Sequence, residues 1–332
     1  MNKEAIVPGA IFIALACLLL TPARSGENPG RTALRLSPPD VRRLDAGSLW
    51  SSQVPELEPV TEYGSFFGLK ITLKLEGGWN TFSGDDIRKG IMGMYDNGVD
   101  FISASGVTNL SNERNAGRGG LEVGGDLIYA LTSRFGIGVG MAGITAWEES
   151  HLAYMQPPWG TGTFQSRPRV RVSTLRAGLF YSFPFAGRLA VSVRGGPAYY
   201  SAEYSCVEGC TGGFPRDGLT YTSYSQEARA KKWGAEGGLG LEFNPNRFVA
   251  IFLEVQGRYA NISGLEGDET ATFFQGGEYR QAAGSGPVYL VETTANPQLD
   301  IIPSGGNVPG GARRATLDFS GVTFLAGLKF RL

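Results

Sequence analysis

The carboxyl-terminal segment TLDFSGVTFLAGLKFRL, residues 316–332, decides the fold because its side chains alternate in kind. Apolar side chains occupy every second position, namely Val322, Phe324, Ala326, Leu328, Phe330 and Leu332. The opposite set includes Thr323, Gly327, Lys329 and Arg331. Since successive side chains of a β-strand point to opposite faces, this segment predicts a strand with one apolar and one polar face.

The same alternation recurs along the chain and predicts about eight strands. It is clearest in residues 67–79, where Lys70, Thr72, Lys74 and Glu76 separate apolar side chains. The remaining strands fall into pairs at 121–131 with 135–147, 175–183 with 189–199, and 233–243 with 249–259. Each is near the length that crosses a bilayer at a tilt.

The connections between these strands alternate strictly between short turns and long loops. The long ones are Asn80–Arg118, Glu148–Arg169, Tyr204–Glu227 and Ser263–Ala315. Bacterial outer-membrane barrels have short periplasmic turns and long outer loops, and an even strand number places both mature termini in the periplasm. The alternative is a soluble β-sandwich or lipocalin-like barrel, which has no reason to segregate loop length by end.

The amino terminus predicts export. Residues 1–25 read as a signal peptide, with Lys3, an apolar run from Ala10 to Leu20, and small residues suited to cleavage after Ser25. A lipoprotein signal ending at Cys17 is the alternative, but three leucines follow that cysteine. Residues 26–66 are proline-containing and aperiodic, which predicts an irregular periplasmic leader before a barrel spanning 67–332. No later run approaches the roughly 18 apolar residues of a transmembrane helix, so a membrane location requires a closed barrel.

Composition agrees with a β protein: 49 glycines and 11% aromatic residues accompany only 18% charged residues. The formal net charge of -1 gives no electrostatic case for nucleic acid. The sequence predicts no cofactor, because it has no phosphate-binding glycine loop. The acidic turns Asp85-Asp86 and Gly267-Asp268-Glu269 lack the spacing of a calcium loop, so no metal site is predicted.

The charged side chains decide which face meets lipid. A charge on the lipid face near the midplane costs roughly 2 to 4 kcal/mol, so the apolar stripes are predicted to face outward. The interior of an eight-stranded barrel is just wide enough for its own side chains, which predicts an ion-paired lumen without a pore. The predicted lumen charges are Lys70, Lys74, Glu76, Glu122, Asp126, Arg176, Arg194, Lys232, Glu236, Glu254, Arg258 and Lys329.

Aromatic side chains near the strand ends predict two interfacial girdles. They are Trp79, Tyr129, Trp147, Phe183, Tyr199, Trp233, Phe243 and Tyr259. Cys206 and Cys210 remain after signal removal, and in an oxidising compartment they predict a local disulfide. The single histidine, His151, lies beside Glu148 and Ser150, which raises a rim hydrolase as a hypothesis. Adjacent strand positions point to opposite faces, however, so we expect no catalytic site.

The segment from Phe67 to Leu332 resembles the small bacterial outer-membrane barrels of the OmpA, OmpX and OmpW type. The resemblance implies an outer-membrane location, contact with lipid and lipopolysaccharide, and recognition of the last strand by the barrel-insertion machinery. Two features depart from that pattern: the chain ends on Leu332 rather than an aromatic residue, and the last loop is long. Within that loop, Ala271–Phe274 and Val288–Val291 leave a ten-stranded barrel open.

The loops suggest three functions. The first is a non-enzymatic outer-membrane barrel whose loops serve surface contact or envelope integrity. The second, implied by the OmpW resemblance, is passage of small apolar molecules, for which a continuous pocket framed by Met92, Met94, Phe101 and Trp147 is expected. The third is the His151 hydrolase. Residues Ile87–Tyr95 predict an amphipathic helix over the barrel mouth.

Overall fold

The computed structural model describes residues 70–332 except 105, 115–118, 148, 157–159, 215–218, 276–277 and 293–295. These residues belong to the second of two compact units, Val54–Leu332. The predicted signal peptide and the leader lie outside the described residues. Among the helices described, none combines the length and apolar character needed to cross a bilayer.

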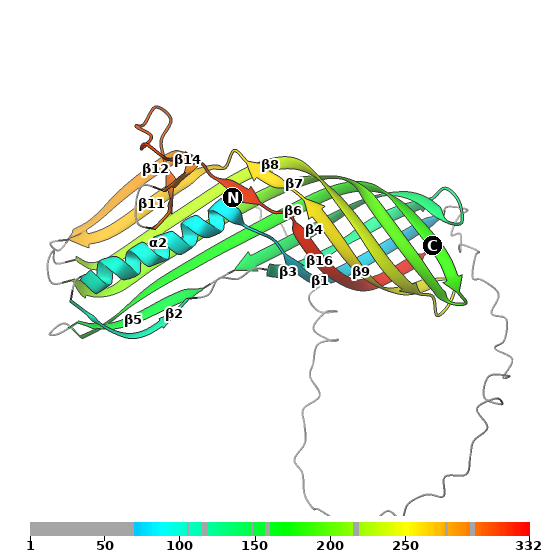
Figure 1. The fold of residues 1–332 in the computed structure, drawn as a ribbon, viewed down its shortest axis with the longest axis horizontal. Coiled ribbons are helices and arrows are strands. Elements are labelled where there is room, and N and C mark those ends of the chain that lie inside the picture. Colours follow the sequence, from blue (N-terminus) through cyan, green and yellow to red (C-terminus); the bar gives the residue numbers. More distant parts are fainter. Residues whose placement is uncertain are drawn as a thin grey trace, which may run out of the picture. The chain divides into compact units, whose positions relative to one another are not determined.

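Eight antiparallel strands close into a ring (Figure 1). They are β1 (Ile71–Thr81), β3 (Gly119–Ala130), β4 (Phe135–Trp147), β6 (Gly160–Ala186), β7 (Leu189–Phe214), β8 (Leu219–Phe243), β9 (Val249–Tyr259) and β16 (Gly321–Arg331). Each strand pairs with the next, and β16 returns to β1 with Lys329 opposite Lys74. The prediction of an antiparallel up-and-down β-barrel of eight strands is therefore confirmed.

The ring continues at one end into a sheet that we call the outer module. Strands β6, β7 and β8 run past the ring, and the sheet grows sideways by further strands on both edges (Figure 1). On one edge lie β5 (Ser150–Gln156) and β2 (Thr108–Glu113); on the other lie β11 (Glu266–Gln275), β12 (Glu278–Val291), β13 (Gln298–Ile301) and β14 (Arg313–Arg314). A short ribbon of β10 (Asn261–Ser263) and β15 (Thr316–Asp318) links module and ring.

Three of the four long connections predicted as loops are mostly strand, among them 263–315, which contains β11 to β14. Residues 148–169 and 204–227 are mostly strand, because β6 and β7 stay in register from Thr163 opposite Thr211 down to the ring. The ten-stranded alternative is also wrong: β11 and β12 pair with β8 and with each other beyond the ring, so they widen the outer module instead of the barrel.

Helix α2 (Asp85–Ala104) lies on the outer module and contacts β13, β15, β12 and β6. The predicted helix at 87–95 is confirmed, and the observed one is longer. Its buried side chains include Ile87, Ile91 and Tyr95. Gly93 permits the close approach, because a Cβ there would meet the Pro297 carbonyl oxygen at 1.6 Å.

Candidate functional site

The outward face of the ring is apolar along every strand. In β9 burial alternates residue by residue, with Leu253 63% exposed and its neighbour Glu254 5% exposed. The same holds in β4, where Val139 is 57% exposed. A surface this apolar is costly in water, and its natural solvent is hydrocarbon.

Aromatic side chains border this apolar surface at both ends. Trp79, Trp233 and Tyr259 are exposed toward the outer module, and Tyr129, Phe183 and Phe243 toward the short turns. Tyr199 is half-buried and packs on Trp233, with ring centroids 5.1 Å apart; the side chain of Trp147 lies outside the described residues. From Trp233 to Phe243 the strand runs about 33 Å, which at a tilt near 40° gives a band of about 25 Å, the height of a transmembrane barrel's apolar belt.

The centre of the lumen holds a network of buried charges. Lys74 Nζ lies 2.7 Å from Glu76 Oε2, 2.8 Å from Glu254 Oε2 and 3.6 Å from Asp126 Oδ2. Arg176 donates from Nε to Asp126 Oδ1 at 2.7 Å and also contacts Glu76 and Glu236. Arg194 pairs with Glu254 and donates to Gln256 Oε1 at 2.7 Å. Charges from different strands therefore neutralise one another across the lumen.

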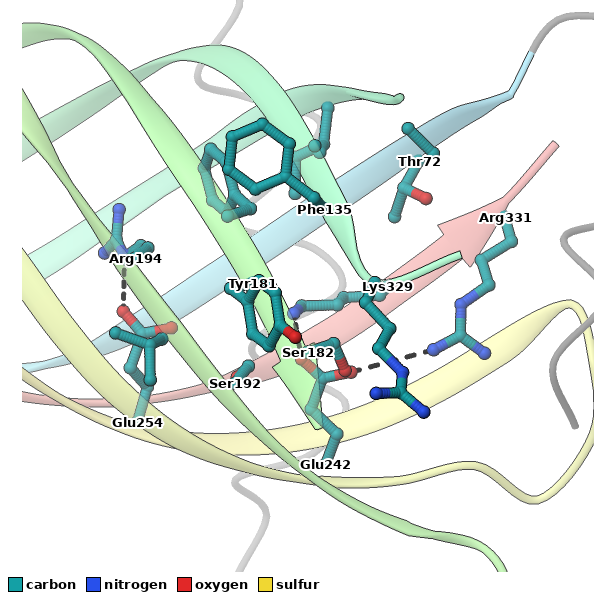
Figure 2. Close-up of a pocket in the computed structure, with 16 residues that line it drawn as sticks. Thr72, Phe135, Tyr181, Ser182, Ser192, Arg194, Glu242, Glu254, Lys329 and Arg331 are labelled. Atoms are coloured by element: carbon teal, nitrogen blue, oxygen red, sulfur yellow. Dashed lines mark hydrogen bonds and ion pairs between the residues drawn. The ribbon is translucent and has the colours of Figure 1, made fainter. Parts of the chain in front are cut away.

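A second cluster closes the lumen at the short-turn end (Figure 2). Lys329 pairs with Glu242, and Arg331 lies 3.6 Å from the same carboxylate while donating to Asn244 Oδ1 at 2.7 Å. The cavity around these groups measures about 60 Å³, and Thr72, Ser192 and Tyr181 also line it. This volume holds a few water molecules and no larger solute.

A third cluster lies toward the outer module. Arg258 donates to Glu122 Oε2 at 2.8 Å and to Thr323 Oγ1 at 2.7 Å. Its guanidinium also stacks 4.5 Å from the centroid of Phe319. Above it, the Tyr200 hydroxyl donates to Glu236 at 2.8 Å. Buried ion pairs and buried aromatic rings thus both fill this end of the lumen.

Ten of the twelve predicted lumen charges are buried, and two are not. Lys70 and Lys232 are exposed. Lys70 precedes β1 at the ring's edge, and Lys232 reaches Ser263 of β10 at 3.3 Å, so solvent solvates both ammonium groups. Glu242, Arg331 and Gln256 also belong to the network. The alternation predicts their place on the polar faces of their strands, but the predicted set of lumen charges omits them.

The predicted disulfide is wrong, because Cys206 and Cys210 are both free thiols. They lie four residues apart on one strand, about 13 Å along its axis, whereas a disulfide needs Cα atoms within about 7 Å. Cys206 contacts Ser166 Oγ at 3.7 Å, and Cys210 contacts the Tyr154 hydroxyl at 3.3 Å. Burial raises the pKa of the Cys206 thiol to about 12, so it stays protonated.

Among the described residues, Ser150, the predicted partner of His151, does not share its face of β5. Ser150 is buried on one face of β5, while His151 points to the other, between Glu113 and Gln165 of the neighbouring strands. Glu149 pairs with Arg167 at 3.1 Å, and Glu148 lies outside the described residues. Nowhere in the described part of the chain do three His, Cys, Asp or Glu side chains gather as metal ligands.

The outer module contains a carboxyl group, that of Glu208, whose pKa differs from its ordinary value. Glu208 of β7 accepts a hydrogen bond from Ser166 Oγ at 3.0 Å. Burial raises the pKa of this carboxyl to about 7. No described ion pair involves Glu208, so the protonation state of this group responds to pH near neutrality.

A closed antiparallel ring with an apolar belt and an ion-paired lumen defines a transmembrane β-barrel. No protein-family model and no curated protein matches the chain. Among solved structures, it is similar to the outer membrane protein OprG from Pseudomonas aeruginosa, at 11% identity and TM-score 0.32, covering 79% of this chain and 96% of that one. A major outer membrane protein from Thermus thermophilus gives 11% identity and TM-score 0.33, with coverage of 79% and 99%. CarO from Acinetobacter baumannii gives 10% and 0.31, with coverage of 80% and 98%. The class follows from ring closure and the two faces, which are independent of these similarities.

Proposed function

We propose that this protein is a non-enzymatic barrel of the bacterial outer membrane that conducts no solute and displays its outer module for surface contact or envelope integrity. In this orientation the short turns and both mature termini face the periplasm, and lipopolysaccharide surrounds the outer aromatic belt. The last strand would be the one that the insertion machinery recognises. The supporting observation is the lumen itself, where Lys74, Arg176 and Arg194 bridge carboxylates of other strands. Arg194 of β7 also lies 3.6 Å from Glu76 of β1, on the opposite side of the ring.

A conducting pathway would have to break these buried pairs. Lys74 is fully buried. A buried charge that loses its partner strongly destabilises the folded protein. At the outer end, Phe319 and Tyr200 pack 6.1 Å apart between centroids, beneath the helix. A plugged lumen therefore lets the strands and the outer module act as a rigid platform.

The apolar-passage alternative finds less support. Phe101, one of its predicted lining residues, is 61% exposed, and Met94 packs against the buried core of the outer module. The cavity between α2 and the barrel rim, bordered by Phe82 and Ile87, measures about 30 Å³. That space holds about two water molecules and is too small for an apolar metabolite.

Single-channel recording of the refolded protein in planar bilayers tests the proposal. The folded state is first verified by heat-modifiable migration on a denaturing gel. We expect no steady openings from folded protein. A paired variant, Arg176→Ala with Arg194→Ala, removes two of the bridges and should give openings where the wild type gives none. Steady conductance by the wild type contradicts the proposal.

A further inference from the structure

The end of the barrel with the short turns carries a ring of exposed positive charge. Arg134 lies in the β3–β4 turn, Arg188 in the β6–β7 turn and Arg247 in the β8–β9 turn, and all three side chains are exposed. Lys70, just before β1, adds a fourth exposed cation at the same end. We call these four residues the basic rim.

Among the described residues, no acidic side chain forms an ion pair with the basic rim, although Arg134 lines the same cavity as Glu242. The turns at 131–134, 184–189 and 244–248 contain no Asp or Glu. The nearest carboxylate in sequence, Glu242, is buried and paired with Lys329. Within the described chain, none of the three turn arginines forms an ion pair, whereas several outer-module arginines do, as Arg114 does with Asp96 at 2.7 Å.

Backbone hydrogen bonds hold the rim in place. The Ser182 amide donates to the Arg134 carbonyl at 2.9 Å, and the Asn244 amide donates to the Arg188 carbonyl at 2.8 Å. The Arg331 amide donates to the Phe248 carbonyl at 2.8 Å. Each turn is thereby fixed to the strand next to it. Because the three turns join different strand pairs, the arginines are distributed around the ring.

Exposed aromatic rings accompany the arginines. Phe185 is 60% exposed three residues before Arg188, and Phe248 is 49% exposed beside Arg247. The Arg247 guanidinium lies 4.7 Å from the centroid of the Phe248 ring. Aromatic rings concentrate at the membrane–water interface, so these neighbours place the guanidinium groups at the depth of lipid headgroups.

We propose that the basic rim binds the phosphate groups of anionic phospholipids in the leaflet that borders the short turns. The proposal rests on the membrane insertion proposed above. A guanidinium forms paired hydrogen bonds with phosphate oxygens, and exposed arginines without carboxylate partners are available for them. Near an anionic surface each engaged arginine favours binding about fivefold.

Lipid selectivity of the full-length refolded protein tests this proposal. Wild type and the variant Arg134→Gln, Arg188→Gln, Arg247→Gln are inserted into vesicles of phosphatidylcholine mixed with phosphatidylglycerol. Protein and its adjoining lipid are then extracted in polymer nanodiscs, and mass spectrometry measures the ratio of the two lipids. The matched control replaces three exposed arginines elsewhere, Arg171, Arg280 and Arg314, with glutamine.

We expect phosphatidylglycerol enrichment of about fivefold or more around the wild type and the control, declining with added salt, and its loss in the rim variant. Equal ratios for wild type and rim variant overturn the inference. So does enrichment that appears only after Glu56, Glu58 and Glu62 become glutamine, because the preceding segment would then be the occupant of the rim. Heat-modifiable migration separates these results from a failure to insert, which would instead contradict the proposed function.

Discussion

Replacing Lys74 with methionine tests the lumen network where it is most tightly coupled. The ammonium group lies within 2.8 Å of two carboxylates, on Glu76 and Glu254, and within 3.6 Å of a third, on Asp126. Methionine keeps an unbranched side chain one atom shorter than that of lysine and removes its charge and hydrogen-bond donors. We therefore expect the barrel to fold with a destabilised lumen.

The size of the effect follows from what the three carboxylates retain. Removing one partner of a buried ion pair costs roughly 3–5 kcal/mol. Glu76 and Glu254 keep contacts with Arg194, and Asp126 keeps Arg176, so we place the loss near the lower limit, about 3 kcal/mol. A second change, Glu76→Gln in the Lys74→Met background, removes one uncompensated charge and should recover part of that loss.

Urea unfolding from lipid vesicles, followed by tryptophan fluorescence, measures these free energies. Lys70→Met is the matched control, because Lys70 precedes the same strand but is exposed. We expect that control to unfold within about 0.5 kcal/mol of the wild type. If Lys74→Met also falls within that range, the ion pairs contribute nothing to the barrel and the reasoning is refuted.

Three further predictions concern other parts of the protein. Leu253→Arg places a charge on the apolar belt and should destabilise the inserted barrel by roughly 2 to 4 kcal/mol, whereas Val308→Arg, exposed outside the ring, should not; equal urea midpoints would contradict the assigned belt. Burial raises the pKa of Glu208 from 4.5 to about 7. The protonated carboxyl therefore contributes its full stabilisation of the fold below pH 4.5, and that stabilisation is lost as the pH rises through 7. Glu208→Gln should therefore stabilise the outer module by up to about 3 kcal/mol above pH 7 and not below pH 4.5. Thermal melting followed by near-ultraviolet circular dichroism measures the difference, with exposed Glu278→Gln as the control. A difference that does not change with pH would contradict this prediction. Peptide mapping of denatured, unreduced protein should find Cys206 and Cys210 both alkylated, and a disulfide-linked peptide would contradict the strand geometry.

The barrel was predictable because its signal is local. Each membrane-crossing strand alternates apolar and polar residues, and that period alone fixes which side chains share a face. Burial of Lys74 and exposure of Leu253 follow directly from it. The number of strands in the ring could not be predicted from the sequence. The alternation in β11 and β12 would be the same whether these strands belonged to the ring or to the outer module.

The outer module and the exact ion pairs were harder to predict. Residues 205–211 have the Ser, Gly and Cys content of a loop. They form strand because β6 and β8 flank them, and Cys206 and Cys210 pack in clusters with side chains of α2. Arg176 and Glu76 are separated by 100 residues, so their pairing depends on strand tilt and register around the ring. The wrong prediction of a disulfide has the same origin. Only the extension of β7 beyond the barrel shows that Cys206 and Cys210 lie on one strand, too far apart to be bridged.

The outward direction of the apolar stripes is most directly measured with spin labels at Val139, Leu241 and Leu253, introduced one at a time after Cys206→Ser and Cys210→Ser. Power saturation compares collisions with oxygen, which dissolves in hydrocarbon, and with a polar nickel complex, which does not. We expect high oxygen and low nickel accessibility at all three positions in lipid vesicles. Labels shielded from both reagents would mean that the stripes meet inside the protein, and the barrel would not be a membrane barrel.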